Sequence, residues 1–147
     1  MLDRKSGELL CEIVRMAGEK ERAVFIHEAA QRMGLGMPAA SRLTGMLSEA
    51  GLLRLMRYGC VMPTEEGFSA ASGIQHRRRI VSAFLAAASG RNPEETAEEC
   101  ARIEYLLGDD TVKGLERILL EGIRLPPTAE IHMEKAHNGG GACIDMP

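Results

Sequence analysis

The chain has 147 residues and a formal net charge of −3 at pH 7, with 45% hydrophobic and 27% charged residues. These values are typical of a globular protein, and the negative charge argues against a nucleic-acid coat, which would carry a strong positive charge. Aromatic residues make up only 3%, so aliphatic side chains must fill the core, which favours packed helices. No apolar run approaches the roughly 20 residues of a membrane span, and no signal-peptide pattern is present. We therefore expect a cytoplasmic protein with no membrane partner.

The helices predicted in the first third of the chain cover about 6–17, 26–33 and 38–49. Ser6 is expected to cap the first. The turn Gly34-Leu35-Gly36 joins the other two, with Pro38 at the first position of the third helix and Gly51 at its end. A short helix, a glycine turn and a second helix predict a helix-turn-helix.

A β-hairpin is predicted next, because the strand-like runs 52–57 and 60–63 meet at Tyr58-Gly59. A hairpin in this place is the wing of a winged helix. Thr64 then caps a long helix predicted over 65–88.

Two more helices are predicted in the last third of the chain. Asn92-Pro93-Glu94-Glu95 combines a cap, a proline and an acidic first turn, so a helix is expected from there to about Leu107. The last helix is predicted over 111–122.

Several segments keep the order and spacing of one known family. They are Pro38-Ala39-Ala40-Ser41-Arg42, Leu47-Ser48-Glu49-Ala50-Gly51-Leu52-Leu53, Thr64-Glu65-Glu66-Gly67, His76 and Glu99-Cys100-Ala101-Arg102-Ile103-Glu104-Tyr105. Over about residues 6–120 the chain resembles the diphtheria-toxin-repressor and manganese-transport-regulator family of metal-dependent transcriptional repressors. The resemblance implies a cytoplasmic homodimer that binds a palindromic operator in double-stranded DNA.

The fold class expected from the elements and the resemblance is mainly α. An N-terminal winged helix-turn-helix, 1–73, is followed by a helical metal-binding and dimerisation domain, 74–125. Residues 126–147 are expected to be a flexible tail. The tail contains soft-ligand residue types at His132, Met133, His137, Cys143 and Met146, but their spacing fits no closed metal site.

The resemblance places DNA contacts in the third helix and the wing. The N-terminal end of the third helix would enter the major groove. The small apolar side chains of Pro38, Ala39 and Ala40 suit thymine methyl groups, and Ser41 and Arg42 suit base edges or phosphates. In the wing, contacts to phosphates are expected from Arg54, Arg57 and Tyr58.

The metal ligands carried over from the family by position fall on Glu8, Cys11, His76, Ala101, Glu104 and Tyr105. Ala101 has no donor atom, and Tyr105 stands where the family has a histidine. Cys100 projects about 40° from Glu104 on the same helix face, so it is a candidate replacement for the ligand lost at 101. The expected ligands are therefore Glu8, Cys11, His76, Cys100 and Glu104.

This ligand set decides which ions are expected. The family implies Fe²⁺ or Mn²⁺, and the thiols and imidazole also suit Zn²⁺, Co²⁺ or Ni²⁺. A second metal site of some family members would fall on Ile80 and Ala97, which have no donor side chains. The bound ion is expected to link the first helix to the fourth and fifth and so to fix the spacing of the two recognition helices in a dimer.

Two alternatives stay open. One is a winged-helix regulator that responds to thiol oxidation or to a small molecule. The chain has four cysteines and no CxxC pair, so free thiols or metal ligands are expected rather than disulfides. The other is a dimeric interaction protein that does not bind DNA, since Ala39 and Ala40 offer few groups that read bases. An enzyme is not expected, because no catalytic triad, phosphate loop or paired-carboxylate cleft is evident.

Overall fold

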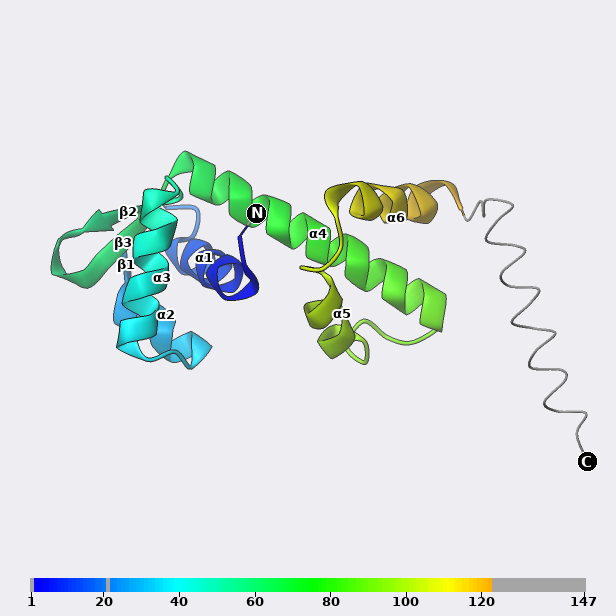
Figure 1. Cartoon of the computed structure of the whole chain (residues 1–147), viewed down its shortest axis with the longest axis horizontal. Coiled ribbons are helices and arrows are strands. Elements are labelled where there is room, and N and C mark those ends of the chain that lie inside the picture. The colour runs from blue at the N-terminus through cyan, green and yellow to red at the C-terminus, as the bar shows by residue number, and fades with distance from the viewer. Residues whose placement is uncertain (1, 21, 123–147) are drawn as a thin grey trace, which may run out of the picture.

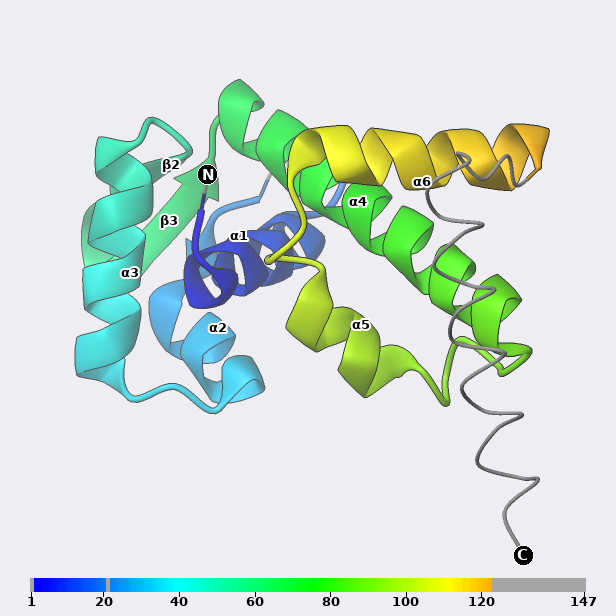
Figure 2. The same cartoon turned by 45° about the vertical axis from the view of Figure 1, so that its right-hand side comes forward.

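A computed structural model describes residues 2–20 and 22–122, and the predicted tail at 126–147 lies outside the described residues. In the described part, the elements in chain order are α1 (Arg4–Ala17), β1 (Val24–Phe25), α2 (Ile26–Met33), α3 (Met37–Glu49), β2 (Leu53–Met56), a 3₁₀ turn (Arg57–Gly59), β3 (Cys60–Pro63), α4 (Glu65–Ser89), α5 (Ala97–Ile103) and α6 (Asp109–Glu121). Figures 1 and 2 show α4 running across the molecule, with α1–α3 and the sheet at one end and α5 and α6 along its other half. The expected mainly α fold with a winged helix-turn-helix is confirmed.

Helix α1 is the centre of the larger core. Leu9, Leu10 and Ile13 are fully buried in the core that α1 forms with α2, α3, α4 and β3. The expected cap at Ser6 is wrong: the side chain of Asp3 accepts the hydrogen bond from the Ser6 backbone N–H, at 3.3 Å, and α1 begins at Arg4. Ser6 itself is buried within the first turn, so it cannot serve as the flanking residue.

The helix-turn-helix has the predicted form. Helix α2 ends at Met33, and Gly34 follows it in a left-handed conformation with φ 65°. The backbone N–H of Leu35 donates to the carbonyl of Ala30. Helix α3 begins at Met37, one residue before the predicted start at Pro38. The glycine turn thus joins α2 to α3 as predicted.

The wing is a three-stranded antiparallel sheet in the order β1-β3-β2. Strands β2 and β3 pair from Leu53 opposite Pro63 to Met56 opposite Cys60. Strand β1, which pairs Val24 with Val61, was not expected from the sequence. Two residues are too few to show the alternation that marks a strand.

The wing joins α4 through a close backbone contact. Thr64 caps α4 by accepting a hydrogen bond from the Gly67 backbone N–H at 3.0 Å, as predicted, and its own hydroxyl donates to the carbonyl of Gly51 at 2.6 Å. A Cβ atom at Gly67 would lie 2.0 Å from the carbonyl oxygen of Leu52. The Thr-x-x-Gly pattern therefore fixes where the long helix leaves the wing.

The second half of α4 packs with α5 and α6 around a small core. Val81, Cys100 and Val112 are its buried members. The predicted boundary between 73 and 74 falls inside α4, which contributes to both cores, and the division into domains stays a prediction.

Helix α5 is shorter than predicted at both ends. The Glu95 and Thr96 backbone N–H groups both donate to the carbonyl of Asn92, so the residues after Pro93 form turns and the helix begins only at Ala97. At its other end, Arg77 of α4 donates to the carbonyls of Glu104 and Leu107. Helix α5 ends at Ile103, and these bonds give carbonyls beyond its end a partner from α4. Among the described residues, no helix is long and apolar enough to cross a bilayer.

Candidate functional site

The exposed side of α3 carries most of the predicted base-reading residues. Pro38, Ser41 and Arg42 are exposed, and Ala39 is partly so. Ala40 is the exception: it is completely buried. Because residue 40 lies on the inward face with Leu43 and Leu47, its methyl group packs in the core and does not reach a DNA groove.

The wing presents a second exposed basic surface beside α3. Arg54, Arg57 and Tyr58 are all exposed, and Tyr58 retains 90% of its accessible surface. The backbone of Tyr58 has φ 62°, a left-handed conformation that is costly for a residue with a Cβ atom. The hairpin thus holds an aromatic side chain out into solvent.

Three arginines on these surfaces have no acidic partner among the residues that the structure describes. None of the ion pairs between described residues involves Arg42, Arg54 or Arg57. Figure 1 shows α3 and the wing side by side at the same end of the molecule. Their uncompensated positive charge suits phosphate groups.

On α1, the predicted ligands Glu8 and Cys11 lie on the side that faces α4 and α5. The Glu8 carboxylate accepts a hydrogen bond from Arg4 Nε at 3.0 Å. The Cys11 thiol lies 3.9 Å from the carbonyl of Ala71 on α4. Burial raises the pKa of the Cys11 thiol, against a smaller lowering by the charge of Arg78.

His76 does not join the other predicted ligands. Its Nε2 lies 3.2 Å from a carboxylate oxygen of Glu116 on α6, and its side chain is more than half exposed. On a helix, positions two apart project about 200° from each other, so His76 and Arg78 leave opposite faces of α4. The imidazole thus contacts α6, while Arg78 extends toward α1 and α5.

Glu104 is buried, and its carboxylate is paired with a cationic side chain of the same chain. Its carboxylate is 2% exposed and accepts three hydrogen bonds from the guanidinium of Arg78, at 2.9–3.1 Å. The pairing and its charge raise the pKa of Arg78, against a smaller opposing effect of burial. A planar guanidinium matches both oxygens of a carboxylate.

Cys100 and Tyr105 complete the surroundings of Arg78. The Cys100 thiol is buried and lies 3.8 Å from the Arg78 carbonyl. Tyr105 packs against α1, where a Cβ atom at Gly7 would lie 3.0 Å from the phenol oxygen. That oxygen is buried and has no hydrogen-bond partner among the described residues, and burial raises the pKa of the phenol.

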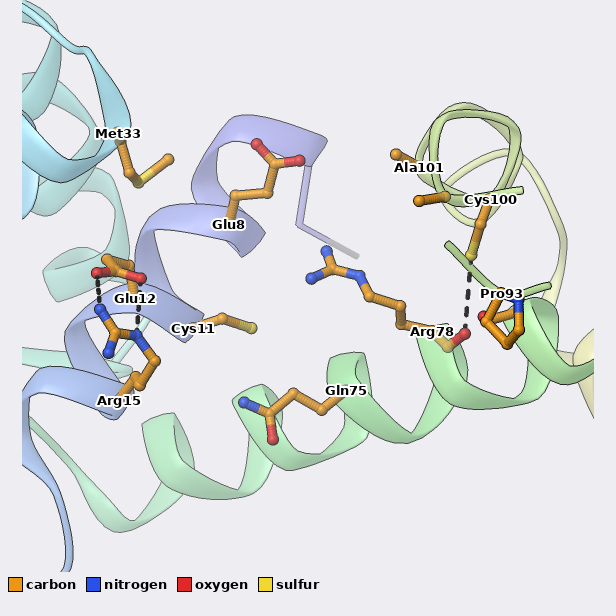
Figure 3. A pocket seen from close by; sticks show the side chains of 12 residues that line it. Glu8, Cys11, Glu12, Arg15, Met33, Gln75, Arg78, Pro93, Cys100 and Ala101 are labelled. Carbon is orange, nitrogen blue, oxygen red and sulfur yellow. Dashed lines mark hydrogen bonds and ion pairs between the residues drawn. The ribbon is translucent and has the colours of Figure 1, made fainter. Parts of the chain in front are cut away.

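An open pocket of about 550 Å³ lies between α1, α4 and α5. Figure 3 shows the guanidinium of Arg78 in this pocket, between Glu8 and Cys11 on one side and Cys100 and Ala101 on the other. Sequence reasoning missed this role of Arg78, which was not among the predicted site residues. Two features of the sequence indicate this role: the acidic residue Glu104, and the absence of a donor side chain at Ala101.

The residues present do not fit a metal ion in this arrangement. His76 contacts α6, Ala101 has no donor, and the carboxylate of Glu104 is occupied by Arg78. Across residues 2–20 and 22–122, no three His, Cys, Asp or Glu side chains come together in a way that could hold a metal. The predicted ligands Glu8, Cys11, His76, Cys100 and Glu104 are thus not assembled into a metal site in this arrangement. The ligand set stays a prediction.

Comparisons with known proteins agree on the architecture. No family model matches the chain. The transcriptional regulator MntR of Escherichia coli O6:H1 is 26% identical over 105 residues, which are 71% of this chain and 64% of MntR. The crystal structure of the manganese-activated repressor ScaR in its apo form has a TM-score of 0.62 and 25% identity, over 82% of this chain and 56% of ScaR.

The chain has the fold of the metal-dependent transcriptional regulators. The resemblance predicted from the sequence is thereby confirmed. A hypothetical protein of Sulfolobus solfataricus shares this regulator fold, with a TM-score of 0.68 and 18% identity over 86% of this chain and 95% of that one. The chain spans just under two thirds of the length of MntR, the curated relative it matches.

Proposed function

We propose that the chain is a DNA-binding transcriptional regulator of the metal-dependent type, a cytoplasmic repressor and not an enzyme. The observation that carries this proposal is the pairing of an exposed α3 with a wing whose arginines have no acidic partner among the described residues. The identity to MntR and the architecture shared with ScaR support it.

Recognition of DNA is assigned to α3. Its N-terminal half presents Pro38 and Ser41 to the major groove, and the guanidinium of Arg42 reaches base edges or phosphates. Arg54, Arg57 and Tyr58 hold the neighbouring phosphates and set the register of α3.

A homodimer is part of the proposal, because one α3 helix reads only half of a palindrome. Leu106 and Leu120 are about 80% exposed near α5 and α6, on the part of the molecule away from α3. Large apolar side chains in such positions favour burial against a second copy.

We extend regulation by a metal ion to this chain from the proteins that it resembles. ScaR is described as manganese-activated and has been crystallised with Zn²⁺. The ions proposed here are those expected from the sequence: Fe²⁺ or Mn²⁺, with Zn²⁺, Co²⁺ or Ni²⁺ as alternatives. No ligand geometry is assigned, since the predicted donors do not converge in the described arrangement.

Regulation by oxidation of the two buried thiols, Cys11 and Cys100, is not favoured. Oxidants react with the thiolate. Burial is the main reason why the pKa values of Cys11 and Cys100 are both raised, so these thiols stay protonated near neutral pH.

The test is a gel shift of the full-length protein on DNA from its own promoter region, against an unrelated duplex of equal length, with each metal and with a chelator. Specific binding that weakens as salt rises is expected. Arg42→Ala should lower the affinity by about 5- to 150-fold for each half-site, which corresponds to the roughly 1–3 kcal/mol of one good base contact. The matched control is Arg117→Ala on α6, which removes the same charge from an exposed position away from α3. Absence of salt-dependent duplex binding would overturn the proposal in favour of an interaction protein.

A further inference from the structure

The pocket between α1, α4 and α5 already contains a positive charge that belongs to the chain. The guanidinium of Arg78 lies among Glu8, Cys11 and Cys100, and it makes three hydrogen bonds to the buried carboxylate of Glu104. These four surrounding residues are four of the five predicted metal ligands. The fifth, His76, contacts Glu116 instead.

A buried carboxylate needs a cationic partner. Glu104 is 2% exposed, and an ionised carboxylate without a partner is strongly disfavoured at such a position. Arg78 supplies one positive charge and a fork of donors that covers both oxygens. Arg78 therefore neutralises the negative charge of Glu104 without a bound metal ion.

A neighbouring arginine holds this pair in place. Arg77 donates to the carbonyl of Glu104 at 2.8 Å and to the carboxylate of Asp109 at 2.8 Å. The Cys100 thiol lies 3.8 Å from the carbonyl of Arg78 itself. Arg77 thus binds the backbone of Glu104, the residue that follows α5, and Arg78 binds its side chain.

We propose that the guanidinium of Arg78 is the resident cation of this site, linking α4 to α5 in place of a metal, and that Glu104 becomes available to a divalent metal only when this guanidinium leaves it. The proposal deepens the regulation of the proposed regulator, on which it rests for the class of ligand. It predicts that the wild-type chain holds divalent metals weakly, because two cations would compete for one carboxylate.

The decisive variant is Arg78→Met, which keeps an unbranched apolar stem and removes the charge. The matched control is Arg79→Met, since Arg79 is the next residue on α4, is exposed and forms none of the ion pairs among the described residues. The probe is Co²⁺ alone, titrated into purified full-length protein and followed by its visible bands and by the near-ultraviolet absorption of a thiolate–cobalt bond.

At least about tenfold tighter Co²⁺ binding is expected for Arg78→Met than for the wild type, with Arg79→Met equal to the wild type. Adding Cys11→Ser to Arg78→Met should weaken the thiolate absorption, which separates this site from the other cysteines. Equal Co²⁺ affinity of the wild type and Arg78→Met would overturn the proposal. Because the titration contains no DNA, it is independent of whether the chain binds an operator.

A second measurement keeps the proposal testable if Arg78→Met does not fold. The side-chain Nε–H of Arg78, observed by nuclear magnetic resonance in the metal-free wild type, should be protected from exchange and should lose this protection in Glu104→Gln. Protection that persists when Co²⁺ is added at a concentration equal to the protein supports Arg78 as the resident cation. Rapid exchange in the metal-free wild type would contradict it.

Discussion

The two arginines of the wing, Arg54 and Arg57, and two arginines of α4, Arg77 and Arg78, have opposite surroundings. Arg54 and Arg57 extend into solvent and form no ion pair among the described residues. Arg77 and Arg78 are both tied to the segment 104–109 by hydrogen bonds and ion pairs. One residue type therefore offers charge to a partner at one end of the molecule and stabilises the fold at the other. A basic side chain is available for DNA binding only when the fold leaves it without an acidic partner.

The largest contrast between the two regions is expected in stability. Arg78→Met leaves the carboxylate of Glu104 buried without its partner, which costs 3–5 kcal/mol for a fully buried pair. Because Arg78 is 42% exposed, we expect the lower end, about 3 kcal/mol. Arg54→Met in the wing should change the free energy of unfolding by no more than about 0.5 kcal/mol. Urea unfolding of both variants checks this difference, and equal losses would contradict the distinction drawn between the two regions.

The joint between the wing and α4 is tested by a pair of glycines on one helix. Gly67→Ala places a methyl group against the Leu52 carbonyl and should destabilise the protein by about 1–3 kcal/mol. Gly73→Ala, also on α4, meets nothing within 4 Å and should stabilise it by about 0.5–1 kcal/mol. Thermal unfolding of the two variants should therefore shift in opposite directions, and a Gly67→Ala variant as stable as the wild type, or more stable, would show that the close contact is not needed.

At the tip of the wing, stability and DNA affinity should change in opposite senses. Tyr58→Gly relieves the left-handed backbone and should stabilise the fold by about 1 kcal/mol. The same change removes an exposed side chain assigned to phosphate contact, so duplex binding should weaken. Unfolding and gel-shift measurements on one preparation check both effects. Unchanged DNA affinity would remove Tyr58 from the interface.

The smallest effect is expected from the buried thiols. Cys11 and Cys100 have pKa values above the usual 9.0, mainly through burial, so the folded chain retains protons that the unfolded chain releases. Their contribution to stability is complete below pH 9.0 and is lost as pH rises toward the folded pKa values. Between neutral pH and about pH 10, the wild type should therefore lose more stability than Cys11→Ala/Cys100→Ala, because only the wild type has these buried thiols. Urea unfolding at both pH values gives the difference, and an equal loss in the two proteins would show that these thiols ionise as readily as in the unfolded chain.

Local signals predicted the winged helix well. The Gly34–Gly36 turn, the Thr64 cap and the hairpin depend on neighbouring residues, so the sequence carries them directly. Strand β1 was missed because two residues have no period. The early start expected for α5 failed because the backbone N–H groups after Pro93 bond back to Asn92.

The candidate site was harder to predict because its key contact joins distant residues. The ion pair between Arg78 and Glu104 spans 26 positions and two helices. Position on the helix face explains why His76 points to α6, but only the packing of α5 brings Glu104 to Arg78. The burial of Ala40 was missed for the same reason, because it depends on which face of α3 packs against the core.

The most direct test of the account is the salt dependence of duplex binding. Each phosphate contact that is lost should reduce the slope of log affinity against log salt by about 0.9. The account predicts that Arg54→Ala/Arg57→Ala lowers the slope by up to about 1.8 for each half-site, or about 3.6 for the homodimer on its palindrome, while Arg79→Ala on α4 leaves it unchanged. A slope that is unaffected by the wing variant, or reduced equally by the α4 variant, would contradict the assignment of DNA binding to α3 and the wing.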